Sequence, residues 1–235
     1  MKRNTLVIAL AGTLSGVLGL SSCNGLLSSF GGEPQELESV SDLAEHVRSV
    51  HVESEVSKER LRSAVAAFIS LTDPGFRGDP QEAFETFVVA IETSEKQSNV
   101  LRKRIDPMLG SAQNFFEDWA SDLDAIENAS LRKRSKDRMI ETHKLYKRIE
   151  RAVDPVLSYS EQINMRLQDY ATYLSNDFNA DSVASLERDV RSLNQLAIKL
   201  DQRFEICLGA TSEYVGQTGM YGQAAETEGM VSSRD

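Results

Sequence analysis

Apolar residues recur at seven-residue spacing along four segments of the chain, at about 39–71, 80–128, 130–176 and from 181 onward. A second apolar register lies three or four positions from the first, and no segment alternates apolar and polar residues as a strand does. A sustained period of 3.5 residues is typical of helices that wrap around one another. The pattern therefore predicts an all-α fold, an antiparallel coiled-coil helical bundle of four long helices.

The connections between these segments are short, and short connections make consecutive helices antiparallel. The two middle helices would each be about 70 Å long at ~48 residues, and the outer two are shorter. Both outer helices pack where the second helix starts and the third ends. We therefore expect four helices at that end and a projecting two-helix hairpin tip, roughly residues 115–143, at the other.

Two aspartates are the expected N-caps of predicted helices. Asp79 is followed by Pro80, which suits a first helical position, and Asp181 precedes the last helix. These residues predict where the second and fourth helices begin.

The predicted tip carries opposite charges on its two arms. The first arm has the acidic residues Asp118, Asp122, Asp124 and Glu127. The second arm has the basic residues Arg132, Lys133, Arg134, Lys136 and Arg138. Folding near residue 129 places the two sets opposite each other, so we expect ion pairs within the hairpin. The alternative is that the basic residues dock an acidic protein partner.

One layer of the predicted core is polar. The serines at core heptad positions are Ser54, Ser57, Ser94, Ser98 and Ser160. The predicted connections bring all five to one level of the bundle. Small residues let helices approach closely, with their hydroxyls bonded to backbone or water, and this is the preferred interpretation. The alternative is a polar cavity that binds a small molecule or a lipid.

The first residues have the form of a secretory signal peptide. Lys2 and Arg3 precede an uncharged, apolar stretch at 5–20, which is short for a permanent membrane span and contains three glycines. The sequence LSSC, residues 20–23, resembles the lipobox of bacterial lipoproteins. This resemblance implies cleavage after residue 22 and a diacylglycerol on Cys23. Two or three acyl chains would anchor the protein stably.

The same resemblance implies a location. Lipoproteins of this kind face the periplasm, and an Asp after the cysteine retains many of them in the inner membrane. Asn24 stands there instead, which favours the outer membrane. The predicted organisation is a signal peptide at 1–22, a flexible tether at 23–37, the bundle at 38–214 and a disordered, Gly-rich tail at 215–235.

Net charge and cysteine content limit the partners. The formal charge is −10, and it becomes −12 when Lys2 and Arg3 are removed with the signal peptide. Such an acidic protein is a poor candidate for binding nucleic acid. If Cys23 is lipidated, Cys207 has no partner within the chain. We expect Cys207 to be buried as a small apolar residue, and a disulfide between two chains is the alternative.

The sequence offers no catalytic or metal-binding motif. The three histidines, His46, His51 and His143, lack ligand spacing, and there is no Cys-x-x-Cys pair or Gly-rich phosphate loop. We expect no catalytic residues, no bound metal and no cofactor, and therefore not an enzyme.

Three stretches resemble one known family. FFEDWASDL (115–123), NASLRKRS (128–135) and FNADSVASLERDV (178–190) resemble an uncharacterised bacterial family of long-helix lipoproteins, known only as a domain of unknown function. The resemblance implies a helical fold and no known activity. The expected function is a lipid-anchored structural or protein-interaction module of the cell envelope. A ligand-binding bundle is the alternative, and self-association through the long helices fits the coiled-coil period equally well.

Overall fold

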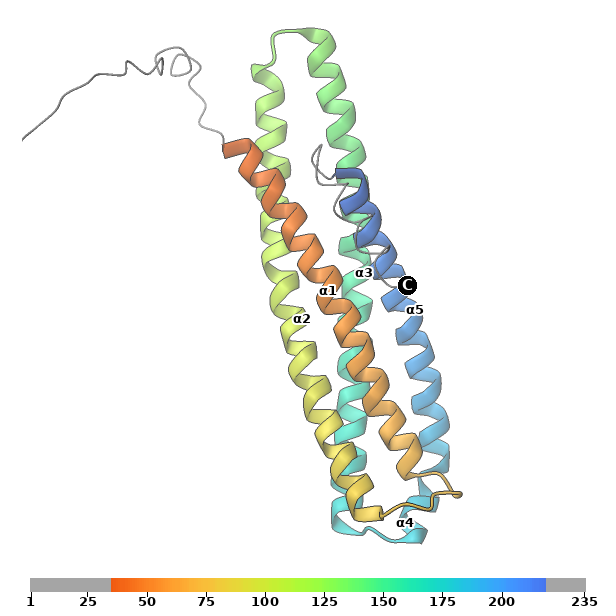
Figure 1. Ribbon diagram of the computed structural model, residues 1–235. Helices are drawn as coiled ribbons and strands as arrows, with labels where there is room; N and C mark the ends of the chain where they lie inside the picture. Colours follow the sequence, from red (N-terminus) through yellow and green to blue (C-terminus); the bar gives the residue numbers. More distant parts are fainter. Residues whose placement is uncertain (1–34, 219–235) are drawn as a thin grey trace, which may run out of the picture. The chain divides into compact units, whose positions relative to one another are not determined.

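The structure, a computed structural model, describes residues 35–218 (Figure 1). The elements in chain order are α1 (Gln35–Leu71), α2 (Pro80–Asp122), the 3₁₀-helix η1 (Leu123–Ala125), α3 (Ala129–Asn176), α4 (Ala180–Ser185) and α5 (Glu187–Thr218). The described part of the chain contains no strand, which confirms the all-α prediction. The predicted signal peptide, Cys23, most of the tether and the tail from residue 219 lie outside the described residues.

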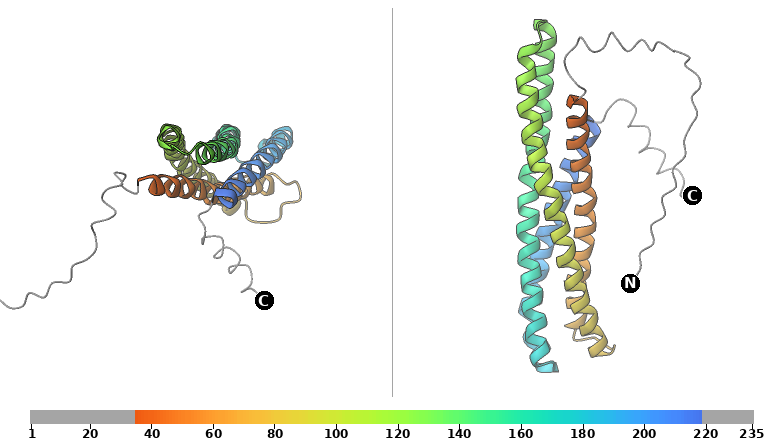
Figure 2. Two further views of the ribbon diagram at one scale, coloured as in Figure 1. Left: turned by 90° about the horizontal axis from the view of Figure 1, so that it is seen from above. Right: turned by 90° about the vertical axis from the view of Figure 1, so that its left-hand side faces the viewer.

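Neighbouring long helices run in opposite directions. Ser94 of α2 contacts Asn164 of α3, and farther along α2 Trp119 contacts Ser135, so numbers rise on one helix as they fall on the other. The same inverse order holds for α1 against α2, for α1 against α5 and for α3 against α5. Figures 1 and 2 show α1 and α5 packed along the α2–α3 hairpin.

The core is formed by the seven-residue stripes. Phe68 of α1 has no exposed surface, and its ring stacks on Tyr170 of α3 with a centroid distance of 4.6 Å. The ring centroid of Phe87 in α2 lies 5.4 Å from that of Phe68. Three helices thus meet at one aromatic contact, which fixes their register near the end where α1 joins α2.

Side-chain caps set most of the helix starts. Asp79 accepts hydrogen bonds from the backbone N–H groups of Gln81 and Glu82 at 2.8 and 3.2 Å, as predicted. The cap of α4 is Asn179 and not the predicted Asp181. Asn179 accepts from the N–H groups of residues 181 and 182, both at 2.9 Å, so Asp181 lies in the first turn.

The predicted fourth helix is interrupted at Leu186. In a continuous helix the Leu186 N–H would donate to the Ser182 carbonyl. That carbonyl accepts the Ser185 hydroxyl at 2.7 Å, and the Leu186 N–H donates to Val183 at 3.1 Å instead. A side chain that competes for a backbone acceptor therefore divides α4 from α5.

The hairpin turn is longer than predicted. α2 ends at Asp122, six residues before the predicted 128, and η1 follows it. Asn128 caps α3 by accepting from the N–H groups of Ser130 and Leu131 at 3.0 and 3.2 Å. An N-cap residue has an extended backbone, so the chain must leave helical geometry before Asn128.

The last helix ends on α3 and extends to Thr218, past the predicted boundary at 214. The Arg138 guanidinium donates to the Gln217 carbonyl at 2.7 Å, and Tyr214 is buried one turn earlier. Both α1 and α5 stop short of the hairpin turn, and α2 and α3 continue beyond them (Figure 1). We call residues 116–139 of this hairpin the tip and the remaining helical bundle the body.

Candidate functional site

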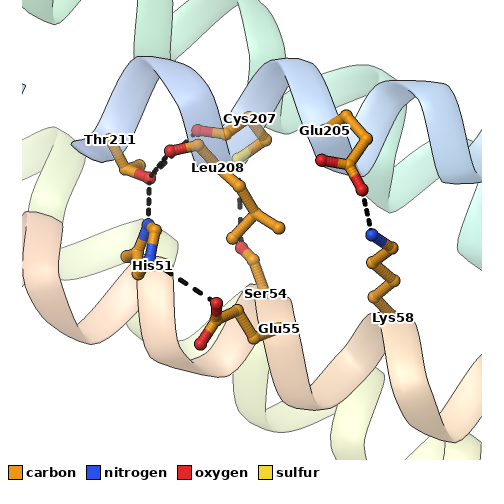
Figure 3. Close-up of polar contacts among 8 residues, drawn as sticks. All are labelled: His51, Ser54, Glu55, Lys58, Glu205, Cys207, Leu208 and Thr211. Carbon is orange, nitrogen blue, oxygen red and sulfur yellow. Dashed lines mark hydrogen bonds and ion pairs between the residues drawn. The ribbon is translucent and has the colours of Figure 1, made fainter. Parts of the chain in front are cut away.

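The structure places the predicted serines at three different helix contacts. Ser54 of α1 is buried against α5, where its hydroxyl lies 3.9 Å from the Cys207 sulfur (Figure 3). Cys207 is 1% exposed and unpaired, which confirms its predicted burial. Burial raises the pKa of the Cys207 thiol, because the thiolate would be poorly solvated there. The thiol is therefore held in its unreactive form.

A hydrogen-bond chain lies one turn away at the same α1–α5 contact. The Nδ1 atom of His51 is 2.7 Å from the hydroxyl of Thr211, which is fully buried (Figure 3). The Thr211 hydroxyl also donates to the carbonyls of Cys207 and Leu208, each at 3.0 Å. With its proton directed at these carbonyls, the Thr211 hydroxyl accepts from His51 in the tautomer that carries a proton on Nδ1. The arrangement is structural, because it joins a side chain of α1 to the backbone of α5 through the buried Thr211 hydroxyl.

Ion pairs continue this contact along α1. The Lys58 ammonium pairs with Glu205 and lies 3.8 Å from Asp201, and Arg62 also pairs with Asp201. The Lys58 side chain is only 14% exposed, so its stem packs on apolar surface while its charge reaches the carboxylates. These contacts hold α1 against α5 and leave no open cationic site there.

At the α2–α3 contact, the side-chain amide of Asn164 bridges the hydroxyls of Ser94 and Ser98. Ser94 donates to the Asn164 side-chain oxygen at 2.7 Å, and the Asn164 amide donates to the Ser98 hydroxyl at 3.1 Å. Ser94 and Asn164 are buried, and Ser98 is half-buried. Sequence analysis missed Asn164 because it stands beside the core register at Ile163, where residues usually face solvent. It also missed Thr211, although a residue four positions after Cys207 continues the predicted register.

A groove opens beside this bridge between α2 and α3. Its volume is about 310 Å³, and Ser98, Ser160 and Asn164 line it together with the Arg102–Glu161 ion pair, whose atoms are 3.6 Å apart. The hydroxyl of Ser160 donates to the carbonyl of Val156 at 2.7 Å. The groove offers polar groups without a strong net charge.

Ser57 belongs to neither of these clusters. Its hydroxyl donates to the Gln97 carbonyl at 3.5 Å, and the Gln97 amide donates to Glu53 at 2.7 Å. The five serines therefore do not surround one cavity. Most of them satisfy their hydroxyls within the protein, as expected of small residues at close helix contacts.

The basic residues of the tip are exposed and do not pair with the acidic arm. Lys133 bonds Asp137 of its own helix at 2.8 Å, which raises the pKa of Lys133. Arg132 donates to the carbonyls of residues 126 and 127 at 2.9 and 3.3 Å. Among residues 115–143, no ion pair joins the two arms, contrary to the sequence expectation. The described helices show no hydrogen bond or ion pair to the side chains of Arg134 and Lys136.

The apolar stripe of the tip is only partly covered. Trp119 and Ile126 on the first arm and Met139 on the second lie on the seven-residue apolar registers but are half-buried, and Leu131 is 48% exposed. The Trp119 indole N–H donates to the Ser135 hydroxyl at 3.0 Å and joins the two arms. The stripe loses its cover where α5 ends.

Aromatic side chains mark the boundary between tip and body. Tyr146 of α3 lies 6.3 Å from Tyr214 of α5 and 5.8 Å from Phe116 of α2, measured between ring centroids. Tyr146 is 3% exposed, and its hydroxyl has no hydrogen-bond partner among the described residues. Burial raises the pKa values of both Tyr146 and Tyr214, because a buried phenolate would be poorly solvated.

An apolar groove lies at the opposite end of the body. Its volume is about 550 Å³, and it is lined by the α1–α2 connection and the start of α4, including Leu71, Phe76, Phe178 and Val183. Within residues 35–218, no three His, Cys, Asp or Glu side chains gather as metal ligands. None of the helices that the structure describes is long and apolar enough to cross a bilayer.

Comparison with known proteins assigns a family and no activity. The model of the family described as "Protein of unknown function (DUF2959)" matches residues 38–217, which include nearly all of the described helices. The match confirms the resemblance to an uncharacterised family. No curated protein matches the chain.

Proposed function

The chain belongs to the DUF2959 family, and we propose that it is a lipid-anchored protein of the bacterial cell envelope that serves as a structural or protein-interaction module. Cys23 is the proposed lipid attachment site, and the helices would face the periplasm from the outer membrane. The proposal for the anchor rests on the charged start, the apolar stretch and the sequence LSSC.

The observation that supports an interaction role is the tip. It extends beyond α1 and α5, its two arms carry opposite charges, and these charges do not pair with each other. Arg134 and Lys136 are exposed, and the side chains of Trp119 and Met139 add partly exposed apolar surface. Such a surface suits a protein partner that presents acidic groups around an apolar centre.

The anchor is tested by the intact mass and membrane fractionation of the native protein. We expect a chain that begins at Cys23, carries added acyl mass and sediments with membranes. Cys23→Ala should lose the added mass, whereas the matched variant Cys207→Ala should keep it. If the native protein, Cys23→Ala and Cys207→Ala all lack the added acyl mass, the proposed anchor is wrong.

The tip is tested by crosslinking in intact cells. The double variant Arg134→Glu/Lys136→Glu should lose a crosslinked protein that the native chain captures, and its helix content should remain unchanged. Arg203→Glu reverses an exposed charge on α5 in the body and should retain the crosslink. Equal capture by all variants would contradict docking through the basic arm.

A second candidate function is supported by the groove between α2 and α3. Its volume of about 310 Å³ and its hydroxyl and amide groups would suit a small uncharged polar molecule. A copurified ligand that is lost in Ser98→Leu but kept in Asn114→Leu, an exposed position on the same helix, would favour this function. Native protein that carries no such ligand would contradict it.

A further inference from the structure

The α5-facing surface of α3 continues past the end of α5. Arg138 donates to the Gln217 carbonyl at 2.7 Å, so its side of α3 faces α5. Arg134 lies four residues before Arg138 and Leu131 lies seven residues before it, so both stand on the same side of the helix. These two residues therefore extend the α5-facing stripe by about two turns without α5 above them.

This surface exposes an apolar side chain and a charged side chain that no other described element covers. Leu131 is 48% exposed and Arg134 is exposed without a polar partner among the described residues. Trp119, which bonds Ser135 next to Arg134, is half-buried, and so is Met139. Tyr146, one heptad after Met139 on α3, is 3% exposed beside Tyr214 of α5. A segment that extended along α3 from the end of α5 would complete the cover.

The chain itself supplies such a segment. Residues 219–235 leave the described structure at Thr218, directly beside Arg138 and at the edge of the uncovered surface. Gly219 is followed by the apolar residues Met220 and Tyr221, and Glu226 and Glu228 come after them. The charge of these glutamates complements Arg134, and the apolar pair complements Leu131.

The distances permit this contact. Arg134 is four residues along the helix from Arg138, which is about 6 Å at 1.5 Å per residue. Eight residues separate Thr218 from Glu226, and a flexible chain of that length has an end-to-end distance of roughly 16 Å. The segment is therefore long enough to follow the surface and to bring Glu226 to Arg134.

We propose that residues 219–235 bind the α5-facing surface of the tip, with Met220 and Tyr221 on Leu131 and Trp119 and with the glutamates at Arg134. The contact requires no second protein, so it holds or fails independently of the proposed docking function. A partner that used the same surface would have to displace this segment.

Trp119 is the only tryptophan in the chain and therefore reports on this surface directly. The full chain is compared with a variant that ends at Thr218. Removing the segment should shift the Trp119 emission to longer wavelength and increase its quenching by acrylamide. Unchanged emission and quenching in a truncated protein with native helix content would overturn the proposal.

A charge variant gives a second test within the full-length chain. Arg134→Glu should increase acrylamide quenching in the full chain and have no further effect in the truncated chain, because the contact is already absent. The matched variant Arg203→Glu should behave as the native protein. If the truncated chain fails to fold, the Arg134→Glu result alone decides, and equal quenching in the two charge variants overturns the proposal.

Protein concentration distinguishes another occupant. Protection of Trp119 by residues 219–235 is intramolecular and should persist on dilution. Protection that disappears on dilution would instead identify a second copy of the chain on the tip and would overturn the proposal.

Discussion

The body and the tip are built from the same two helices but differ in what covers them. In the body, α1 and α5 lie over the α2–α3 hairpin, and Tyr146, Ile149 and Val153 are at most 3% exposed. In the tip, the same heptad stripe continues through Trp119 and Met139, which are only half-buried. Burial therefore depends on the number of neighbouring helices as well as on the apolar pattern of the helix itself.

The charged residues differ in the same way. The body contains ion pairs within single helices and also pairs that join different helices, as between Lys58 and Glu205 or between Arg148 and Glu213. In the tip, the Lys133–Asp137 pair lies within α3, and Arg134 has no described partner. The body uses its charges to hold helices together, whereas the tip keeps charge available for contact with another segment or protein.

The largest loss of stability is expected for a substitution of Phe68 in the body, and it can be compared with a substitution in the tip. Phe68→Ala removes a fully buried ring that contacts Phe87 and Tyr170, and it should lower the free energy of unfolding by about 3–5 kcal/mol. Urea denaturation followed by circular dichroism measures the change. Leu131→Ala in the tip should cost less than about 1 kcal/mol, because the side chain is already half exposed. Equal losses would contradict the difference in cover.

A smaller loss is expected for the polar bridge of the body. Asn164→Ala leaves the buried Ser94 hydroxyl without its acceptor and should cost about 1–3 kcal/mol. The double variant Ser94→Ala/Asn164→Ala removes both groups and should cost less than the sum of the single changes. Additive losses in urea denaturation would show that the two side chains do not act as a pair.

At the boundary between body and tip, removal of an unpaired hydroxyl should stabilise the protein. Tyr146→Phe deletes a buried hydroxyl that has no partner among the described residues, and it should raise the free energy of unfolding by about 1 kcal/mol. Tyr173→Phe is the control, because that hydroxyl is bonded to Ser185 on the surface. A loss of stability in Tyr146→Phe would mean that the hydroxyl has a partner.

The same tyrosines predict an alkaline limit to stability. The pKa values of Tyr146 and Tyr214 are raised by burial, so the unfolded chain releases these protons first as the pH rises. Their contribution is fully present below the ordinary tyrosine pKa of about 10 and is lost progressively above it. Denaturation midpoints measured from pH 8 to 11 should therefore fall less in Tyr146→Phe than in the native protein.

The smallest effect is expected in the tip. Lys133→Ala removes an exposed pair within one helix and should leave the denaturation midpoint unchanged. Lys58→Ala is the counterpart in the body, where the side chain packs between α1 and α5, and it should lower the midpoint. A larger effect at Lys133 than at Lys58 would reverse the proposed roles of charge in the two regions.

Much of the fold could be predicted because each long helix repeats the seven-residue apolar spacing many times. The heptad stripes located the four long helices, and Asp79 with Pro80 located the start of α2. The errors arose where one local interaction decides the backbone. Asn179 caps α4 and leaves Asp181 in its first turn, and the Ser185 hydroxyl occupies the carbonyl that a continuous helix needs.

The candidate site could be predicted less completely. Counting polar residues at core positions found Ser54, Ser94 and Ser160, all of which are buried. It could not find Asn164, because whether a residue beside the core register is buried depends on the crossing of two helices. It also could not predict that the tip charges would find partners on their own helix or on α5, since that depends on where α5 ends.

The contact between Arg138 and Gln217 also bears on the order in which the molecule is assembled. It joins residues 79 positions apart, so α3 is complete long before the ribosome has made the end of α5. Until then, α1 is the other long helix available to cover the inner surface of the α2–α3 hairpin. Synthesis of α5 ends this exposure along the body and leaves it at the tip. Among the described helices, the tip thus keeps the surface that the hairpin exposed before α5 was made.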